Sequence, residues 1–308
     1  MERSGKRAGF SRGALRVTAA VWVLLSMTGA ACAQQGAGNG WKPVEEAMGR
    51  PGMVMGDVLR FGMPRKDLQV MVHGTAIKPG LALGSWAAFK KMDKDAMVMG
   101  DLVLTEEEIE PVMRKRQEGG IEIAGIHNHL IGEQPRILYM HVASRGDAVQ
   151  MAKAIHDALA LSKTPGPDAA AAPAASELSG IDQRKIEEIL GRSGKVNGGI
   201  LQFGVPRAET ITDAAMVVPP SMGVATAINF QPTGEGKAAI TGDFELLGKE
   251  VNPVMKALRE HGIDVTAVHS HMLTEEPRLF FMHFWANEDA AKLAKGLRAA
   301  LDLTNSAK

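Results

Sequence analysis

The sequence repeats itself once, and this duplication limits what the chain can fold into more than any other feature. Phe61-Gly62-x-Pro64-Arg65 recurs as Phe203-Gly204-x-Pro206-Arg207, an offset of 203 − 61 = 142 residues, and Gly100-Asp101 recurs as Gly242-Asp243 at the same offset. One offset kept over many segments is not a chance event, so one module is used twice. We expect repeat copies over residues 41–161 and 182–304, joined by a Pro/Ala-rich linker over residues 162–181.

Within each copy the pattern predicts a short helix, several strands, a second helix, a hairpin and a closing helix. In copy one the opening helix is expected over residues 44–48 and the closing amphipathic helix over residues 147–161. The strands are expected over residues 54–61, 69–72, 81–89 and 97–104, with a hairpin from residues 121–130 and 136–142. Strands with helices at intervals, and no regular βαβ alternation, indicate an α+β fold.

The start of the second helix is predicted from copy two. There Asn252 can act as the cap and Pro253 suits the first helical position. At about 120 residues each copy could fold alone, or it could pair with its twin across a pseudo-twofold axis. The hydrophobic periodicity does not decide between these two arrangements.

The first residues have the features of an export signal. A basic leader that includes Arg7 and Arg12 precedes an apolar run over residues 17–31, which is too short to span a membrane. Ala31-Cys32-Ala33 then gives a small-x-small cleavage pattern, so we expect a signal peptide over residues 1–33. Alternatively, Cys32 could be lipidated and anchor the protein to a membrane. Either reading places the protein outside the cytoplasm, in the periplasm or the extracellular space.

The mature chain has few features of a nucleic-acid-binding protein. Removal of residues 1–33 takes away five basic residues and one acidic residue, leaving 35 − 5 = 30 basic against 35 − 1 = 34 acidic, a net charge of −4. No basic stripe remains, and aromatic residues are only 5% of the sequence, which argues against nucleic acid as a partner. Cleavage after Ala33 also removes the single cysteine, which excludes disulfides and thiolate metal sites.

Six of the nine histidines belong to one repeated cluster. Each copy carries His-x-His, then Glu-x-Pro-Arg, then a third His: His127, His129, Glu133, Arg136 and His141 in copy one, and His269, His271, Glu275, Arg278 and His283 in copy two. Residues i and i+2 of a strand point to one face, so the first two histidines are neighbours.

If His127 lies opposite Tyr139 across the hairpin, His141 lies on the same face and within reach of it. Three imidazoles would then converge in each copy, and Glu133 or Glu275 could add a carboxylate. Such a set suits Zn²⁺ first among the borderline divalent ions. A one-residue slip of register would put His141 on the other face.

Other readings of these residues stay open. The histidines could form a hydrogen-bonded polar core or an anion site instead of a metal site. Glu133 and Arg136, like Glu275 and Arg278, are expected to brace the turn as a local salt bridge, with a catalytic glutamate or a ligand-binding arginine as the alternative. Asp101 and Asp243 follow a glycine and are expected to serve a turn or cap. Met140 and Met282 alternate away from the histidine face and are expected in the core.

The chain resembles the LppY/LpqO family, bacterial lipoproteins that share a domain of unknown function. The strings that carry this resemblance are Phe61-Gly62-x-Pro64-Arg65, Leu83-Gly84-Ser85-Trp86-Ala87-Ala88-Phe89, Met99-Gly100-Asp101-Leu102-Val103-Leu104 and the block from His127 to His141. Nearly all of the mature chain is covered. The resemblance implies an envelope protein and brings no established activity or catalytic residues.

Three functions are compatible with the sequence. A non-catalytic binding module for a metal ion, a small molecule or a cell-wall component ranks slightly first, since two equal sites raise avidity. A metal-dependent hydrolase, with Glu133 or Glu275 as base, ranks close behind. A structural protein with a histidine-rich polar core ranks last.

Overall fold

The computed structural model describes residues 40–167 and 177–307, which lie in one compact unit. The expected signal peptide, Cys32 and part of the linker lie outside the described residues. No helix within the described part is long and apolar enough to cross a membrane.

Each copy forms one six-stranded antiparallel sheet, and the two sheets have the same strand order, so the fold is an α+β tandem duplication. In sheet order the first contains β1 (Met53–Met55), β2 (Val58–Pro64), β5 (Gly84–Lys91), β6 (Ala96–Thr105), β9 (Ile137–Gly146) and β7 (Ile123–His127). The second contains β10 (Lys195–Asn197), β11 (Ile200–Pro206), β14 (Ala225–Gly234), β15 (Lys237–Leu247), β18 (Leu279–Asp289) and β16 (Asp264–His269).

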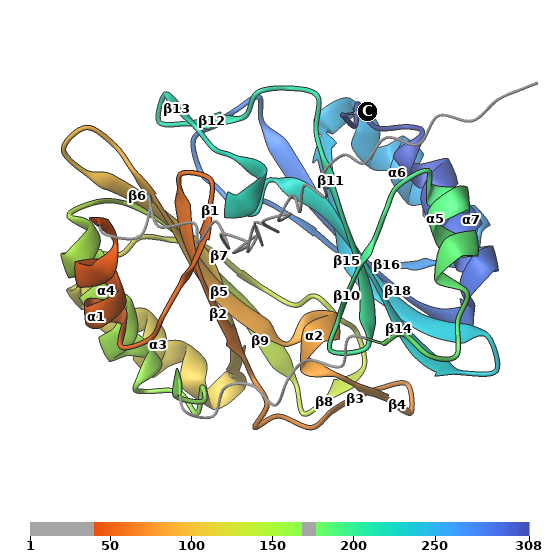
Figure 1. Ribbon diagram of the computed structural model, residues 1–308, viewed down its shortest axis with the longest axis horizontal. Coiled ribbons are helices and arrows are strands. Elements are labelled where there is room, and N and C mark those ends of the chain that lie inside the picture. The colour runs from red at the N-terminus through yellow and green to blue at the C-terminus, as the bar shows by residue number, and fades with distance from the viewer. Residues whose placement is uncertain (1–39, 168–176, 308) are drawn as a thin grey trace, which may run out of the picture. The chain divides into compact units, whose positions relative to one another are not determined.

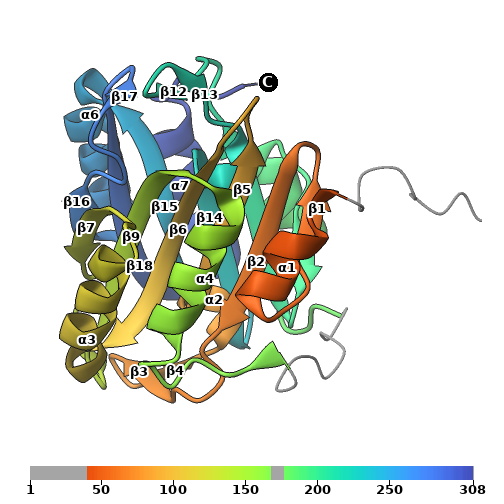
Figure 2. The ribbon, with the colours of Figure 1, turned by 90° about the vertical axis from the view of Figure 1, so that its left-hand side faces the viewer.

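Three helices cover the outer face of each sheet (Figure 1). They are α1 (Lys42–Met48), α3 (Glu106–Glu118) and α4 (Ala148–Leu159) in copy one, and α5 (Gln183–Leu190), α6 (Gly248–Glu260) and α7 (Ala290–Leu301) in copy two. Figure 2 shows the first set lying across one face of its sheet. Asp147 and Asp289 cap α4 and α7 by accepting hydrogen bonds from Gln150 N and Lys292 N.

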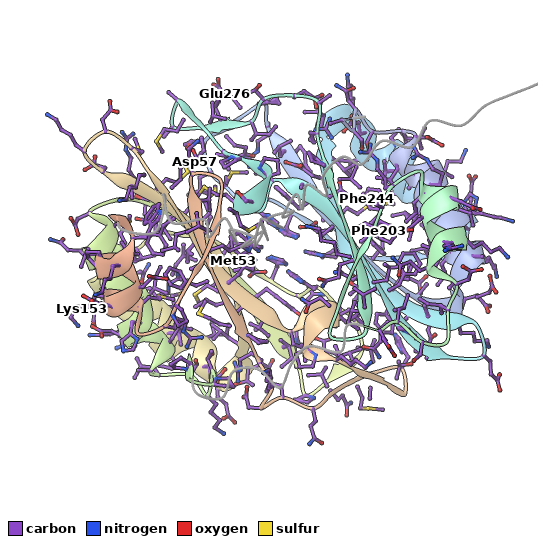
Figure 3. The ribbon with its side chains drawn as sticks, in the orientation of Figure 1. Met53, Asp57, Lys153, Phe203, Phe244 and Glu276 are labelled. Carbon is purple, nitrogen blue, oxygen red and sulfur yellow. The ribbon has the colours of Figure 1, made fainter. Side chains whose placement is uncertain are left out.

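Two of the four apolar clusters lie between a sheet and its own helices. Met140 packs there in copy one and Met282 in copy two, as expected for methionines that face away from the histidines. Phe203 and Phe244 fill the same layer of copy two (Figure 3). Because successive residues of a strand point to opposite faces, the residues next to these point toward the other copy.

The inner faces of the two sheets share their core. Tyr139 and Val103 of copy one cluster with Ala239 and Trp285 of copy two. In a second shared cluster, Met99 of copy one packs with residues of copy two that include Phe281. The copies therefore form a four-layer sandwich of helices, sheet, sheet and helices, and the alternative that sequence periodicity left open is decided in favour of a shared core.

Each copy also sends a segment across to the other sheet. In copy one this segment comprises β3 (Val70–Val72), β4 (Thr75–Ile77) and α2 (Pro79–Ala82), and in copy two β12 (Thr212–Asp213), β13 (Met216–Val217) and the 3-10 helix η3 (Pro220–Met222). Gln231 Oε1 accepts from Lys78 N at 2.7 Å, and Gln231 Nε2 donates to Ala76 O at 2.8 Å. In return, Arg60 Nη1 donates to Ser221 O at 2.5 Å.

The predicted start of the second helix is wrong. In copy two α6 begins at Gly248, and Pro253 lies inside it. The start is fixed by Glu250, whose Oε2 accepts from Leu247 N at 2.8 Å and from the Arg207 guanidinium at 2.7 Å. The carboxylate accepts from an N–H group at the helix start that would otherwise have no partner. This bond stabilises the start of the helix by more than the hydrogen bond lost at the internal proline destabilises it.

The predicted strand limits also need correction. The strand expected over residues 54–61 is divided between β1 and β2 by a turn at Gly56, whose φ of 65° suits glycine. The strand expected over residues 81–89 starts only at Gly84, after α2. The strand expected over residues 121–130 ends at His127, and a two-residue strand β8 (Glu133–Gln134), matched by β17 (Glu275–Glu276), lies in the turn that follows.

We predict that Gln231→Ala lowers the free energy of unfolding of the whole chain by about 2 kcal/mol, because it leaves Lys78 N–H and Ala76 C=O without their partner. Urea denaturation followed by tryptophan fluorescence measures this loss. Gln202→Ala removes only exposed bonds, one donated to Gly80 O and a long one accepted from Asn197 Nδ2, and serves as the control with a loss below about 1 kcal/mol. A shared core would be contradicted if urea unfolded the protein in two separate transitions and Gln231→Ala shifted only the later one.

Candidate metal centre

The six repeated histidines meet in one cluster between the two sheets. The predicted hairpin register is confirmed, since His127 at the end of β7 pairs with Tyr139, and His141 pairs with Gly125. The rings of His127 and His141 lie 4.7 Å apart between centroids, so both side chains share the inner face. Copy two repeats this arrangement, with His269 opposite Phe281 and His283 opposite Ala267.

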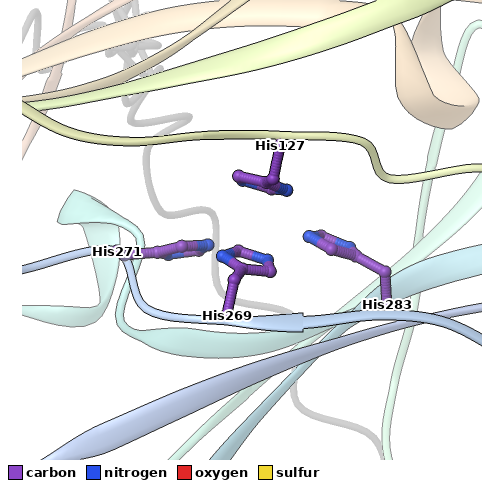
Figure 4. A group of neighbouring side chains, drawn as sticks. All are labelled: His127, His269, His271 and His283. Carbon is purple, nitrogen blue, oxygen red and sulfur yellow. The ribbon is translucent and has the colours of Figure 1, made fainter.

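The histidines of the two copies are paired across the pseudo-twofold axis. His127 stacks on His269 with ring centroids 3.5 Å apart. His129 lies 3.7 Å from His283, and the equivalent pair, His141 and His271, lies 3.9 Å apart. Figure 4 shows His127 coming from copy one to face three histidines of copy two.

Two groups of histidines within the described residues have ring nitrogens close enough to hold a metal ion, with all ligand atoms of a group within 4.8 Å of one another. One group combines His127 with His269, His271 and His283, and the other contains His127, His129 and His141. His127 belongs to both. The sequence suggested a separate site in each copy, whereas the structure places both trios in a single centre to which both copies contribute.

The hydrogen bonds of the rings leave one nitrogen of each histidine unused. His283 Nδ1 donates to Gly242 O at 2.8 Å, and His127 Nδ1 donates to Asn128 O at 3.0 Å. Because a carbonyl oxygen only accepts, these bonds place the proton on Nδ1 and the lone pair on Nε2. The Nε2 atoms of all six histidines are buried and have no hydrogen-bond partner among the described residues.

Burial also favours the neutral form of these rings. Desolvation is the largest cause that lowers the pKa of each of the six, and for His283 it lowers the pKa to about 4. Charge repulsion among the rings adds to this effect for His129, whose pKa is lowered further by His283 and His127. A neutral imidazole is the form that binds a metal ion.

Asp101 and Asp243 belong to this centre, and the expectation of a turn or cap role for them is wrong. Asp101 Oδ2 lies 3.6 Å from His129 Nε2, and Asp243 Oδ2 lies 3.2 Å from His271 Nε2. Burial, followed by the charge of Asp243, raises the pKa of Asp101 to about 8. The pKa of Asp243 is also raised, by desolvation.

The glycine before each aspartate has a packing role. A Cβ on Gly100 would lie 2.7 Å from Trp86 O, so Gly100 allows β5 and β6 to approach closely in mid-strand. A signal for these aspartates was present in the sequence: an acidic residue repeated inside a strand that is otherwise apolar. Such a residue lies on a buried face and needs a polar partner there.

The glutamates and arginines of the turn lie outside both histidine groups. In copy two the expected local brace is present, because Glu275 accepts from Arg278 Nη1 at 3.2 Å and from Leu279 N at 3.1 Å. In copy one Arg136 pairs instead with Glu106, at 3.6 Å between Nε and Oε1. Glu133 is buried, with 8% of its surface exposed.

Both copies match the family model described as Domain of Unknown Function (DUF1259), at residues 42–161 and 184–303. The chain therefore belongs to this family and carries two tandem copies of its domain. None of the curated proteins matches the chain. Among solved structures it matches a trimeric bacterial microcompartment shell protein, PduB, with 11% identity over 82% of this chain and 89% of that chain, at a TM-score of 0.21. A likeness at that TM-score carries no argument about fold or function.

We predict that the metal-free protein loses stability as the pH falls from about 6.5 to about 4. In this window the unfolded chain binds protons on histidines whose folded pKa is lowered, so each of the six favours unfolding by up to about 1.4 kcal/mol per pH unit. Asp101, Asp243 and Glu245 have raised pKa values in the folded chain and stabilise it as the pH falls. These three carboxyls offset only part of the effect of the six histidines.

The measurement is the urea midpoint at a series of pH values in the presence of EDTA. A variant with His127, His129, His269 and His271 changed to Gln should show a shallower dependence, because four of the titrating rings are gone. Equal slopes for the two proteins would show that these histidines keep ordinary pKa values in the folded chain.

Proposed function

We propose that this protein is an exported envelope protein of the LppY/LpqO type whose two copies together bind a divalent metal ion, with Zn²⁺ as the first candidate. The basic leader and apolar run before Ala31-Cys32-Ala33 support export to the periplasm or the cell exterior, either as a soluble protein or with a lipid anchor at Cys32. We propose no catalytic step as its main role, and its further partner would be a small molecule or a cell-wall component.

The observation that carries the metal proposal is the set of six buried Nε2 atoms that lack hydrogen-bond partners among the described residues. A buried polar atom without a partner lowers the free energy of unfolding by about 1–3 kcal/mol. Six such atoms in one cluster would therefore strongly destabilise a purely structural core. A bound cation uses these lone pairs and removes that cost.

Ring spacing within each copy also suits a shared ion. Two imidazoles bound to one tetrahedral Zn²⁺ through bonds of about 2.0–2.1 Å have ring centres about 5 Å apart. The centroid of His127 lies 5.0 Å from that of His129 and 4.7 Å from that of His141, while the centroids of His129 and His141 lie 6.4 Å apart. In copy two His269 lies 4.9 Å from His271 and 4.8 Å from His283.

The other two readings of the histidines have less support. A hydrogen-bonded polar core would join the rings to one another or to the aspartates. Two Nε2 atoms do approach an aspartate, at 3.6 Å for His129 and 3.2 Å for His271, but none of the six has a hydrogen-bond partner among the described residues. An anion site needs positively charged partners, whereas burial lowers the pKa values of the imidazoles and so favours their neutral form. A cation meets none of these objections.

A metal-dependent hydrolase is the second candidate. It is favoured by the group His127, His129 and His141, since three histidines leave a fourth position on a tetrahedral ion for water. Glu133 and Glu275, the expected bases, lie outside both groups, and the Glu275 carboxylate is already bonded to Arg278 and Leu279 N. Binding is therefore placed ahead of hydrolysis.

Elemental analysis of the mature protein, purified without chelator, tests the proposal. We expect about one or two metal equivalents per chain for the wild type. Loss of the metal is expected when His127, His129, His269 and His271 are all changed to Ala. The matched control changes the histidines outside the cluster, His73, His156 and His261, to Ala and should keep the metal. A wild type that holds no metal after dialysis against Zn²⁺, with the quadruple variant merely less stable, would sink the proposal.

Chelation gives an independent readout. If the ion binds the folded chain only, a ligand concentration of 100 Kd adds about 2.7 kcal/mol to the free energy of unfolding. We expect EDTA to lower the melting temperature of the wild type and of the His73/His156/His261 control, and to leave that of the quadruple variant unchanged.

A further inference from the structure

The two sets of three histidines have nearly the same geometry. They are the copy-one trio, His127, His129 and His141, and the copy-two trio, His269, His271 and His283. The ring centroids of His127 and His141 lie 4.7 Å apart, and those of the equivalent pair, His269 and His283, lie 4.8 Å apart. Ring spacing therefore does not decide which trio binds an ion more tightly, and the decision falls to the charges around each trio.

Two arginines lie near the copy-one trio. The pKa of Asp101, the aspartate beside this trio, is raised to about 8, chiefly by burial, and Arg116 and Arg60 are the cations that oppose this rise. Desolvation lowers the pKa of Arg60 to about 10 and that of Arg116 to about 9, and the charge of Asp101 counteracts this lowering in both. Both guanidinium groups therefore stay protonated at neutral pH.

Asp101 is the one carboxyl that compensates these two cations. Arg116 is 0% exposed, and its three guanidinium nitrogens have no hydrogen-bond partner among the described residues. Arg60 donates to Ser221 O and lies 3.9 Å above the ring of Trp86, the residue that pairs with Asp101 across β5 and β6. With Asp101 ionised, the charge beside the copy-one trio is −1 + 2 = +1.

The copy-two trio has neither arginine. At the offset of 142 residues, Arg60 corresponds to Gln202 and Arg116 to Leu258. The pKa of Asp243 is raised by desolvation, and no arginine contributes to its shift. With Asp243 ionised, the charge beside the copy-two trio is −1, so the two trios differ by two unit charges.

The other buried charges do not offset this difference. Arg207 Nη1 donates to Glu245 O at 2.7 Å, and its equivalent Arg65 donates to Val103 O at the same distance, so this pair of arginines is common to both copies. Glu245 stands two residues beyond Asp243 on β15, where copy one has Val103. It is a further carboxyl in copy two, which attracts a cation when it is ionised.

We propose that the copy-two trio binds the metal ion first and much more tightly, because Arg60 and Arg116 repel a cation from the copy-one trio. This inference rests on the proposed metal centre and names the half that holds the ion. A divalent ion is repelled by each arginine twice as strongly as a monovalent ion at the same distance.

A second ion in the copy-one trio would also be repelled by the first. One ring nitrogen of His127 lies within 4.8 Å of the ligand atoms of the copy-two trio, so two ions would be close neighbours. Two divalent ions repel each other four times as strongly as two unit charges at the same distance. We therefore expect one tightly bound ion per chain.

The first test compares matched variants of the two trios in the mature protein, with Zn²⁺ alone as the probe. Equilibrium dialysis with elemental analysis gives the stoichiometry, and competition with a chromogenic Zn²⁺ chelator gives the affinity. His269→Gln with His271→Gln should weaken binding about 100-fold or more, whereas His127→Gln with His129→Gln should weaken it by less than about tenfold. The single variants His269→Gln and His127→Gln give the same comparison if a double variant fails to fold.

The second test gives the copy-one trio a charge pattern closer to that of copy two. It starts from the His269→Gln/His271→Gln variant, in which the copy-one trio is the remaining complete trio. Adding Arg116→Leu, the residue of the twin copy, should raise Zn²⁺ affinity about tenfold or more. The matched control, Arg114→Leu, removes an arginine of the same helix whose side chain is 70% exposed and screened by solvent, and should leave the affinity unchanged.

Three results would overturn this inference while Zn²⁺ binding by the wild type kept the proposed function intact. They are equal losses in the two histidine pairs, two Zn²⁺ equivalents of equal affinity in the wild type, and the same affinity after Arg116→Leu as after Arg114→Leu. Failure of the wild type to bind Zn²⁺ would overturn both.

Discussion

A six-stranded sheet with apolar residues on both faces must cover both, and three helices per copy cover only one. This constraint determines the architecture, because the face left over can be buried only against an equivalent surface, and the twin copy supplies it. The strands β6, β9, β15 and β18 consequently run through the middle of the molecule, with helices packed on one side and a second sheet on the other.

The histidine cluster has its unusual properties because of where this constraint places it. His141 and Asp101 are paired across central strands, and the opposing sheet excludes water from them. The histidine and aspartate side chains are therefore desolvated together. Desolvation keeps the imidazole rings neutral and leaves their Nε2 atoms without solvent. The crossing segments around α2 and η3 hold the two copies together, through hydrogen bonds with Gln231 and Arg60 of the opposite copy.

Much of this arrangement follows from local sequence rules, and the rest depends on contacts between distant segments. Alternation along strands was enough to place His127 opposite Tyr139 and to bring His141 to the same face. The same rules could not show that His127 stacks on His269, since periodicity tells which face is buried and not what buries it. Asp101 was misassigned because a Gly-Asp pair is typical of turns, whereas here the glycine permits close strand packing. The start of α6 was misplaced because the buried partner of Glu250 is Arg207, 43 residues earlier in the chain.

Joining the two copies in one chain has a consequence for how the interface can change. In a symmetric dimer of identical subunits every substitution occurs on both sides of the axis, so a new side chain must be tolerated twice. Here each half varies independently, and the two halves have diverged. Arg116, buried in α3 of copy one, corresponds to Leu258 in copy two, and Glu245 of copy two corresponds to Val103 in copy one. Tandem fusion thus keeps the geometry of a twofold assembly, but the two halves no longer need to have the same sequence.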